Sequence, residues 1–146
     1  MQILIGVLLL CGAACSFGQT LALKEGLWET TMLNDDGSPS TRTHDCVTQK
    51  AFLELMSKAG MHPGCKVTNQ NISSHGFTID VSCDSTGVQV RTHTVMELLD
   101  PEHERTTTNM KVTANGKSND STTKSTGHFL KSDCGSIKPG ERDFPD

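Results

Sequence analysis

The chain has few aromatic and few basic residues, and both shortages narrow what it can be. Its 146 residues include one tryptophan, five phenylalanines and no tyrosine, so aromatic residues make up 4% of the sequence. A core with so few large side chains is thin, and covalent cross-links would add to its stability. Lysine and arginine together number 13 against 17 acidic residues, and they are scattered along the chain. The sequence therefore offers no basic patch for a nucleic-acid partner.

Motifs for catalysis and for metal binding are also missing. The sequence has no Cys-x-x-Cys pair, which argues against both a zinc site of that spacing and a thioredoxin-like redox site. It has no Gly-x-Ser-x-Gly motif around a nucleophilic serine. We expect no two histidines to converge, and therefore no metal site, no cofactor and no enzyme. The histidines are His44, His62, His75, His93, His103 and His128.

The N-terminus begins with "MQILIGVLLLCGAACSFGQ", an apolar run followed by small residues. This pattern is typical of a secretory signal peptide, and the run is short for a membrane span. Cleavage after Gly18 would leave one periplasmic or secreted domain, residues 19–146, with no membrane span. Cleavage before Cys15 would instead remove residues 1–14 and leave a lipoprotein anchored to the membrane through Cys15. The run could also stay as an N-terminal anchor or form a buried strand.

Four cysteines remain after either cleavage, and two of them enclose "GCKVTNQNISSHGFTIDVSC". Both halves of this stretch alternate, and "SSHG" between them favours a turn, so we predict a β-hairpin. Cys65 then lies opposite Cys83, and Asn71 lies opposite Phe77. Opposed cysteines in antiparallel strands are within reach of a disulfide, which an oxidising compartment preserves. The predicted bonds are Cys65–Cys83 and, by elimination, Cys46–Cys134.

Further turns divide the rest of the chain into antiparallel strands. A four-residue turn at residues 84–87 would place Cys83 opposite Val88. A proline-containing turn in "LDPEH" then places Val90 opposite Val112, and Asn115-Gly116 is the strongest hairpin signal in the chain. The last strand, "SNDSTTKSTGHFL", is almost entirely polar. We predict that it lies at the edge of the sheet, where its lysines discourage pairing with another chain.

The N-terminal half contributes a strand and a helix. "GLWETTML" predicts a strand with Trp28 in the core, and "TQKAFLELMSKAG" predicts a helix capped by Thr48. The apolar face of this helix would carry Phe52, Leu55, Met56 and Ala59. The predicted fold class is α+β, dominated by an antiparallel β-meander, with one short helix packed on the sheet and two disulfides.

The alternation gives the sheet an apolar face and a polar face, and each is a candidate binding surface. One short helix could leave part of the apolar face open as a pocket, with an ordinary core as the alternative. On the polar face we predict a weak Asp80–Arg91 ion pair, and a plain solvated surface that carries this pair is the alternative to a binding surface. The apolar candidates are Phe77, Ile79, Val90, Met96, Met110 and Val112. The polar candidates are Asp80, Arg91, His93 and Lys111.

Several landmarks occur together along the chain. They are the apolar leader, "LKEGLWETT", "CVT", the Gly-Cys-Lys element and the last cysteine in "KSDCG". In this combination the chain resembles the DUF3617 family of exported bacterial proteins of unknown function, over roughly residues 23–135. Typical members carry an arginine-rich segment before the last cysteine, where this chain has "STGHFLKSDC". The resemblance implies export and a fold, and it transfers no catalytic residues.

From these observations we expect an exported, non-enzymatic protein that binds a small molecule or an envelope partner through its sheet. A structural or stress-tolerance protein without a specific ligand is the alternative from a different class, and an enzyme is the third. A roofed cavity would favour binding, and a closed core would favour the structural role. A buried cluster of converging histidines or carboxylates would favour an enzyme.

Overall fold

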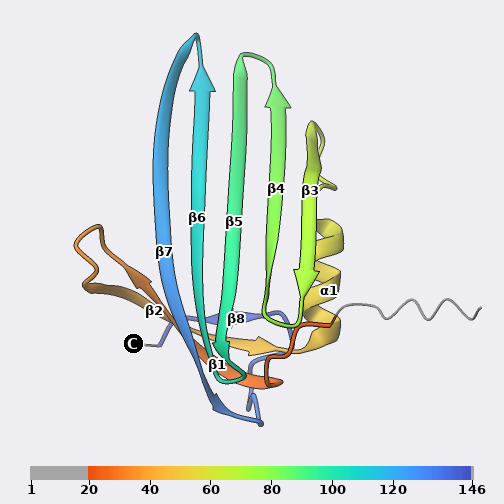
Figure 1. Ribbon diagram of the computed structural model, residues 1–146, viewed down its shortest axis with the longest axis vertical. Helices are drawn as coiled ribbons and strands as arrows, with labels where there is room; N and C mark the ends of the chain where they lie inside the picture. Colours follow the sequence, from red (N-terminus) through yellow and green to blue (C-terminus); the bar gives the residue numbers. More distant parts are fainter. Residues whose placement is uncertain (1–19, 146) are drawn as a thin grey trace, which may run out of the picture.

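The computed structural model describes residues 20–145, which form one antiparallel sheet and one helix (Figure 1). The predicted signal peptide, its cleavage after Gly18 and the lipidation of Cys15 lie outside the described residues. The elements are β1 (Gly26–Leu33), β2 (Pro39–Val47), α1 (Gln49–Lys58), β3 (Cys65–Ser73), β4 (Gly76–Ser85), β5 (Val88–Asp100), β6 (His103–Ala114), β7 (Lys117–Lys131) and β8 (Arg142–Asp143). The strands lie in the order β3-β4-β5-β6-β7-β1-β2-β8. The predicted fold class is confirmed.

The β3–β4 hairpin begins in the predicted register and then leaves it. Cys65 lies opposite Cys83 and Val67 opposite Val81, as predicted. A bulge between Val67 and Asn69 then shifts the pairing by one residue. Ile72, rather than Asn71, therefore lies opposite Phe77. The bulge places an apolar side chain opposite an aromatic one, a pairing that the polar Asn71 could not supply.

The β4–β5 hairpin is shifted by two residues from the prediction. Thr86 and Gly87 alone form the turn, and Gly87 takes a positive φ of 76°, a conformation that glycine adopts without strain. Cys83 consequently lies opposite Val90, not Val88. Because the shift is even, every side chain stays on its predicted face, although each has a different neighbour.

The β5–β6 register and the Asn115-Gly116 turn are confirmed. Val90 lies opposite Val112. Both turn residues have positive φ values, 51° and 74°, as a two-residue type I′ hairpin requires.

The predicted edge position of the last strand is wrong for its second half. β1 pairs with β7 from Lys124 to Lys131, so this half lies inside the sheet. Residues 117–123 pair with β6 but not with β1, and this half is a free edge. The sequence did not predict this position because neighbouring strands can bury one face of a polar strand. Ser125 is 8% exposed although its neighbours in the sequence are hydrophilic.

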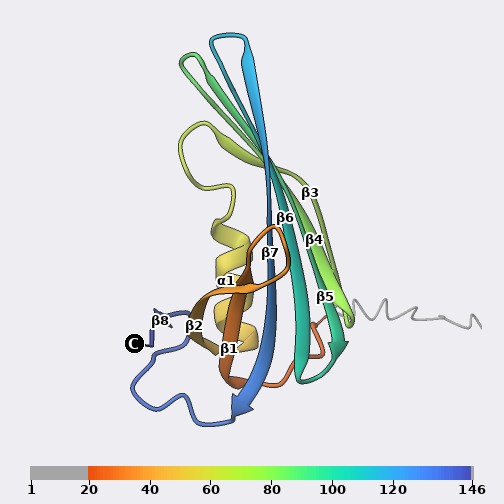
Figure 2. The same cartoon turned by 90° about the vertical axis from the view of Figure 1, so that its left-hand side faces the viewer.

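Helix α1 packs against one face of the curved sheet and encloses the core there (Figure 2). The Thr48 side chain accepts a hydrogen bond from the Ala51 amide, which confirms the predicted N-cap. The ring centroids of Phe52 and Phe77 lie 5.3 Å apart, with the ring planes inclined at 49°, and Met56 is buried. Leu55 was predicted on the same face but is 68% exposed, because the sheet covers a narrower stripe of the helix than the apolar pattern suggested.

Two disulfides and an N-terminal segment close the ends of the sheet. Cys65 bonds Cys83 and Cys46 bonds Cys134, as predicted. Residues 20–25 cross the ends of two hairpins, where the Ala22 amide donates to the Ser74 carbonyl and the Lys24 amide donates to the Pro101 carbonyl. Among residues 20–145, no helix has the length and apolar character to span a bilayer.

Candidate functional site

The six predicted apolar residues share one face of the sheet but do not gather in one place. Ile79 and Met96 are 7% and 8% exposed, and Phe77 lies opposite Met96 in the half of the face that α1 covers. Val90 and Val112 lie opposite each other, six residues from Met96 along β5 and about 20 Å away. Met110, in this second half, is 39% exposed. The face therefore divides into a covered core and a partly open apolar area.

The polar face holds a groove that runs across the strands. Two rows of polar side chains, each running across the strands, form the sides of the groove. Between them lies a row of residues whose side chains point to the other face of the sheet, and this row forms the floor of the groove. The volume of the groove is about 440 Å³, and crossing from β3 to β7 gives it a length of roughly 19 Å. The sides are lined by Thr68, Asp80, Arg91, His93, Asn109, Lys111, Asp120 and Thr122, and the floor by Val81, Thr92, Met110 and Ser121.

One side of the groove carries two separate groups of hydrogen-bonded side chains. His93 Nδ1 lies 2.5 Å from Asp80 Oδ1, and the Asn69 amide donates to the other oxygen of Asp80 at 3.0 Å. These hydrogen bonds, with that of His93 the stronger, hold the pKa of Asp80 below its ordinary value. Further along, the Thr122 hydroxyl donates to Asn109 Oδ1 at 2.8 Å.

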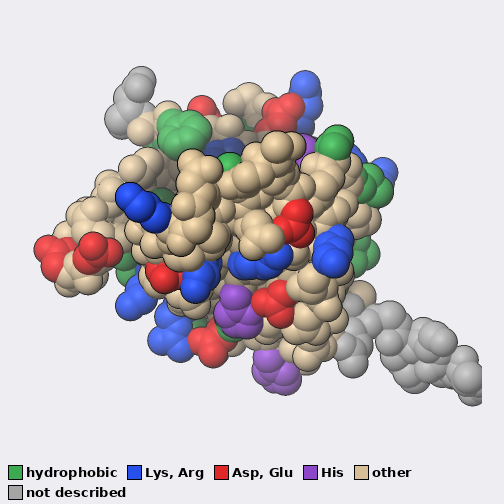
Figure 3. All heavy atoms as spheres, turned by 90° about the horizontal axis from the view of Figure 1, so that it is seen from above, with side chains coloured by type: hydrophobic (Ala, Val, Ile, Leu, Met, Phe, Trp, Pro, Cys, Tyr) green, Lys and Arg blue, Asp and Glu red, His purple; other side chains and the backbone are tan. Residues whose placement is uncertain are grey.

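The other side of the groove is charged. Arg91 lies directly opposite Lys111, and Lys111 lies directly opposite Asp120. The predicted Asp80–Arg91 ion pair is wrong: Arg91 Nη2 contacts Asp84 Oδ1 at 3.0 Å, and Asp80 contacts His93. The cause is the two-residue shift between β4 and β5. Seen from above, acidic and basic side chains are mixed over the visible surface (Figure 3).

The structure thus places all four predicted polar residues, Asp80, Arg91, His93 and Lys111, around the same groove. Sequence reasoning missed Asp120 and Thr122, because β7 was treated as an edge strand without a register. A signal for them was present in the two-residue Asn115-Gly116 turn. That turn fixes the pairing of β6 with β7 and so sets Lys111 opposite Asp120.

Two histidines occupy directly opposed positions on neighbouring strands, which the sequence did not predict. His103, predicted in a turn, begins β6, and it lies directly opposite His128 of β7. Glu29 of β1 is the next position in the same row, and His44 of β2 follows it. His44 Nε2 lies 3.3 Å from Glu29 Oε2. The pairing of β1 with β7, distant in sequence, assembles this row.

A buried carboxyl group, that of Glu104, lies on the opposite face of the sheet and is closely packed by its neighbours. Burial raises the pKa of Glu104, the negative charge of Asp45 raises it further, and a hydrogen bond from the Thr106 hydroxyl opposes both. A Cβ atom on Gly127 would lie 2.5 Å from Glu104 Oε1, so the carboxyl packs closely against the β7 backbone. This packing indicates a structural role for Glu104.

We expect Glu104→Gln to stabilise the protein at neutral pH. A raised folded-state pKa means that the stability supplied by Glu104 is complete below its unfolded-state pKa and is lost as pH rises through the folded-state pKa. Glutamine has nearly the same shape and does not ionise. Denaturant unfolding of both proteins between about pH 4 and about pH 8 should show an advantage of the variant that grows with pH. A pH-independent difference would contradict this assignment.

Together these features define a class of protein: a small disulfide-bonded sheet with one helix on its inner face and a polar groove across its outer face. Residues 23–134 match the family described as "Protein of unknown function (DUF3617)", and the chain belongs to this family. The matched region runs from the segment before β1 to the second cysteine of the Cys46–Cys134 bond. No curated protein and no solved structure gives a significant match.

Proposed function

We propose that the protein is exported and binds a small polar ligand with an anionic group in the groove of its polar face. We further propose that it binds this ligand without catalysing a reaction. The observation that carries the proposal is the direct opposition of Arg91 and Lys111 on neighbouring strands inside the groove. Like charges at opposed positions destabilise a sheet, and an anion bound between them would offset this repulsion.

The surroundings of the two cations support this site. Arg91 already contacts Asp84, whereas among residues 20–145 Lys111 forms no ion pair, although Asp120 lies at the opposed position. Lys111 therefore has donors available for a ligand. Asp80, Asn109 and Thr122 line the opposite side and offer hydrogen-bonding groups to a polar ligand. The groove suits a molecule with an anionic end and a neutral polar body.

Export is supported by the apolar leader in the sequence and by two disulfides, which persist in oxidising compartments. Binding without catalysis is supported by the environment of His93. Its hydrogen-bond partner is Asp80, and among the described residues no serine, threonine or cysteine side chain donates to it. A histidine–carboxylate pair without a nucleophile lacks the arrangement that covalent catalysis uses.

Native mass spectrometry of the protein purified from its own host tests this proposal. We expect a ligand that is released on denaturation. Lys111→Ala should bind the ligand about tenfold more weakly and, purified in the same way, carry less of it, because a hydrogen bond to a charged group contributes about this factor in affinity. Lys124→Ala is the matched control, since Lys124 lies on the same face but outside the groove lining. Bare wild-type protein, or equal occupancy in the two variants, would refute the proposal.

A further inference from the structure

His93 faces the two cations of the groove from the other side. It lies on the same face of β5 as Arg91, two residues further along, and diagonally across from Lys111 of β6. Residues two positions apart on a strand are separated by about 7 Å, and diagonal neighbours by about 7–8 Å, which long side chains can span. An anionic group bound at Lys111 therefore comes within reach of the His93 imidazole.

Asp80 determines which nitrogen of His93 carries the proton. His93 Nδ1 lies 2.5 Å from Asp80 Oδ1. This hydrogen bond, and next the one from the Asn69 amide, hold the pKa of Asp80 below its ordinary value, so the group is an ionised carboxylate at neutral pH. An ionised carboxylate only accepts hydrogen bonds, and Nδ1 must therefore donate. In neutral His93 the other nitrogen, Nε2, is then an acceptor without a proton.

Protonation of His93 reverses what Nε2 presents to a ligand. Among residues 20–145 Nε2 has no hydrogen-bond partner, and the side chain is 49% exposed. Neutral His93 presents a lone pair at this position, which repels an anion. Protonated His93 presents a positively charged N–H donor, which attracts one. The same position in the groove therefore rejects or accepts an anionic group according to the charge of one ring.

The charged groups around His93 couple its protonation to the ligand. Asp80 of β4 attracts the imidazolium, whereas Arg91 of β5 and Lys111 of β6 repel it, and these three strands place no other charged side chain directly or diagonally opposite the ring. Arg91 is partly neutralised by Asp84, so Lys111 contributes most of the repulsion. A bound anion removes this repulsion and favours the protonated ring. Because such coupling is reciprocal, the protonated ring favours the anion by the same factor.

We propose that the groove takes up its anionic ligand together with one proton on His93, so that it holds the ligand in acidic surroundings and releases it as pH rises through the range in which imidazoles lose their proton. The coupling rests on the anion-binding groove of the proposed function and adds its regulation. Lys111 supplies the permanent positive charge of the site, and His93 supplies a charge that depends on pH. The ligand group is one that stays anionic throughout this range, such as a carboxylate or a sulfate.

Titration with sodium sulfate at about pH 5.5 and about pH 8 tests this coupling. Sulfate keeps its charge over this range, and the backbone amide signals of Arg91 and Lys111 in NMR spectra report its binding. We expect the wild-type affinity to be about tenfold higher at the lower pH, because a hydrogen bond to a charged group contributes about this factor. His93→Gln cannot gain a charge, so its affinity should be the same at both pH values.

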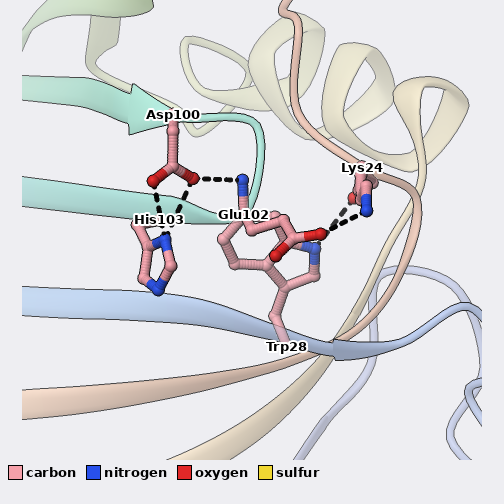
Figure 4. A network of polar contacts seen from close by, with 5 residues as sticks. All are labelled: Lys24, Trp28, Asp100, Glu102 and His103. Carbon is pink, nitrogen blue, oxygen red and sulfur yellow. Dashed lines mark hydrogen bonds and ion pairs between the residues drawn. The ribbon is translucent and has the colours of Figure 1, made fainter.

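His103→Gln is the matched control. Figure 4 shows that His103 is paired with an aspartate, as His93 is: its Nδ1 lies 2.8 Å and 2.9 Å from the two oxygens of Asp100. His103 begins β6 and lies outside the groove lining. This variant removes a histidine–aspartate pair without touching the groove, and it should keep the pH dependence of the wild type.

Each contrary outcome contradicts a different step. Equal wild-type affinity at the two pH values, with binding still weakened by Lys111→Ala, would overturn the coupling and leave the anion site standing. A pH dependence that persists in His93→Gln would overturn the role of His93. Absence of Lys111-dependent sulfate binding at both pH values would overturn the anion site of the proposed function, and the coupling with it. Circular dichroism at both pH values shows whether each variant is folded.

Discussion

Replacing Cys46 and Cys134 together with serine is expected to lower the free energy of unfolding by about 4.6 kcal/mol. The bond closes a loop of 88 residues, and in the chain-entropy account the stabilisation grows with the logarithm of loop length. It also holds the segment leading to β8 against β2, where the Gly140 amide donates to the Cys46 carbonyl. Denaturant unfolding of the oxidised wild type and of the variant measures the difference.

The shorter disulfide provides the internal comparison. Cys65 and Cys83 are 18 residues apart, so replacing both with serine should cost about 3.2 kcal/mol, less than the loss of the longer bond. In addition, the two strands that carry them remain paired along the rest of the β3–β4 hairpin. Equal losses for the two variants, or a larger loss at the hairpin, would show that loop closure is not the main source of the effect.

Trp28→Ala is expected to destabilise the protein by about 3–5 kcal/mol, because it removes the largest side chain of a thin core. Trp28 is 2% exposed, its ring packs edge to face with Phe129 at 6.1 Å, and its Nε1 donates to the Lys24 carbonyl at 2.9 Å. The measurement is the free energy of unfolding in urea. With one tryptophan in the chain, circular dichroism must replace fluorescence for this variant.

Two variants separate the contributions of Trp28. Trp28→Phe keeps an aromatic ring but leaves the Lys24 carbonyl without its indole donor, so its loss should be clearly smaller than that of Trp28→Ala. Leu99→Ala removes an apolar side chain that is 62% exposed, and it should change stability by no more than about 0.5 kcal/mol. If Leu99→Ala were as destabilising as Trp28→Ala, burial would not explain the effect.

Local signals in the sequence predicted most of the fold. The alternation on either side of "SSHG" gave the β3–β4 hairpin and brought Cys65 opposite Cys83, and Asn115-Gly116 gave the β6–β7 turn. Thr48 gave the start of α1. These features depend on residues close together in the sequence, where turn chemistry and periodicity determine the conformation.

The candidate sites were predicted less completely, because they depend on exact neighbours. Asp80 was placed on the correct face, but the two-residue β4–β5 turn gave it His93 as a partner in place of Arg91. The histidine row depends on the pairing of β1 with β7, and no turn joins these two strands. A pattern of alternating residues reports which face a side chain occupies, and it does not report which distant strand lies beside it.

The pairing of β1 with β7 also has a consequence for how the chain acquires its structure. The hairpins from β3 to β7 join strands that follow one another, so each can close as soon as its two strands are available. The β1–β2 pair, made first during synthesis, has no neighbour on its β7 side until Phe129 and the residues around it emerge. Until then, Trp28 and an open strand edge remain exposed to solvent. The risk of aggregation and proteolysis is therefore greatest in the interval between the formation of the β1–β2 hairpin and the pairing of β1 with β7.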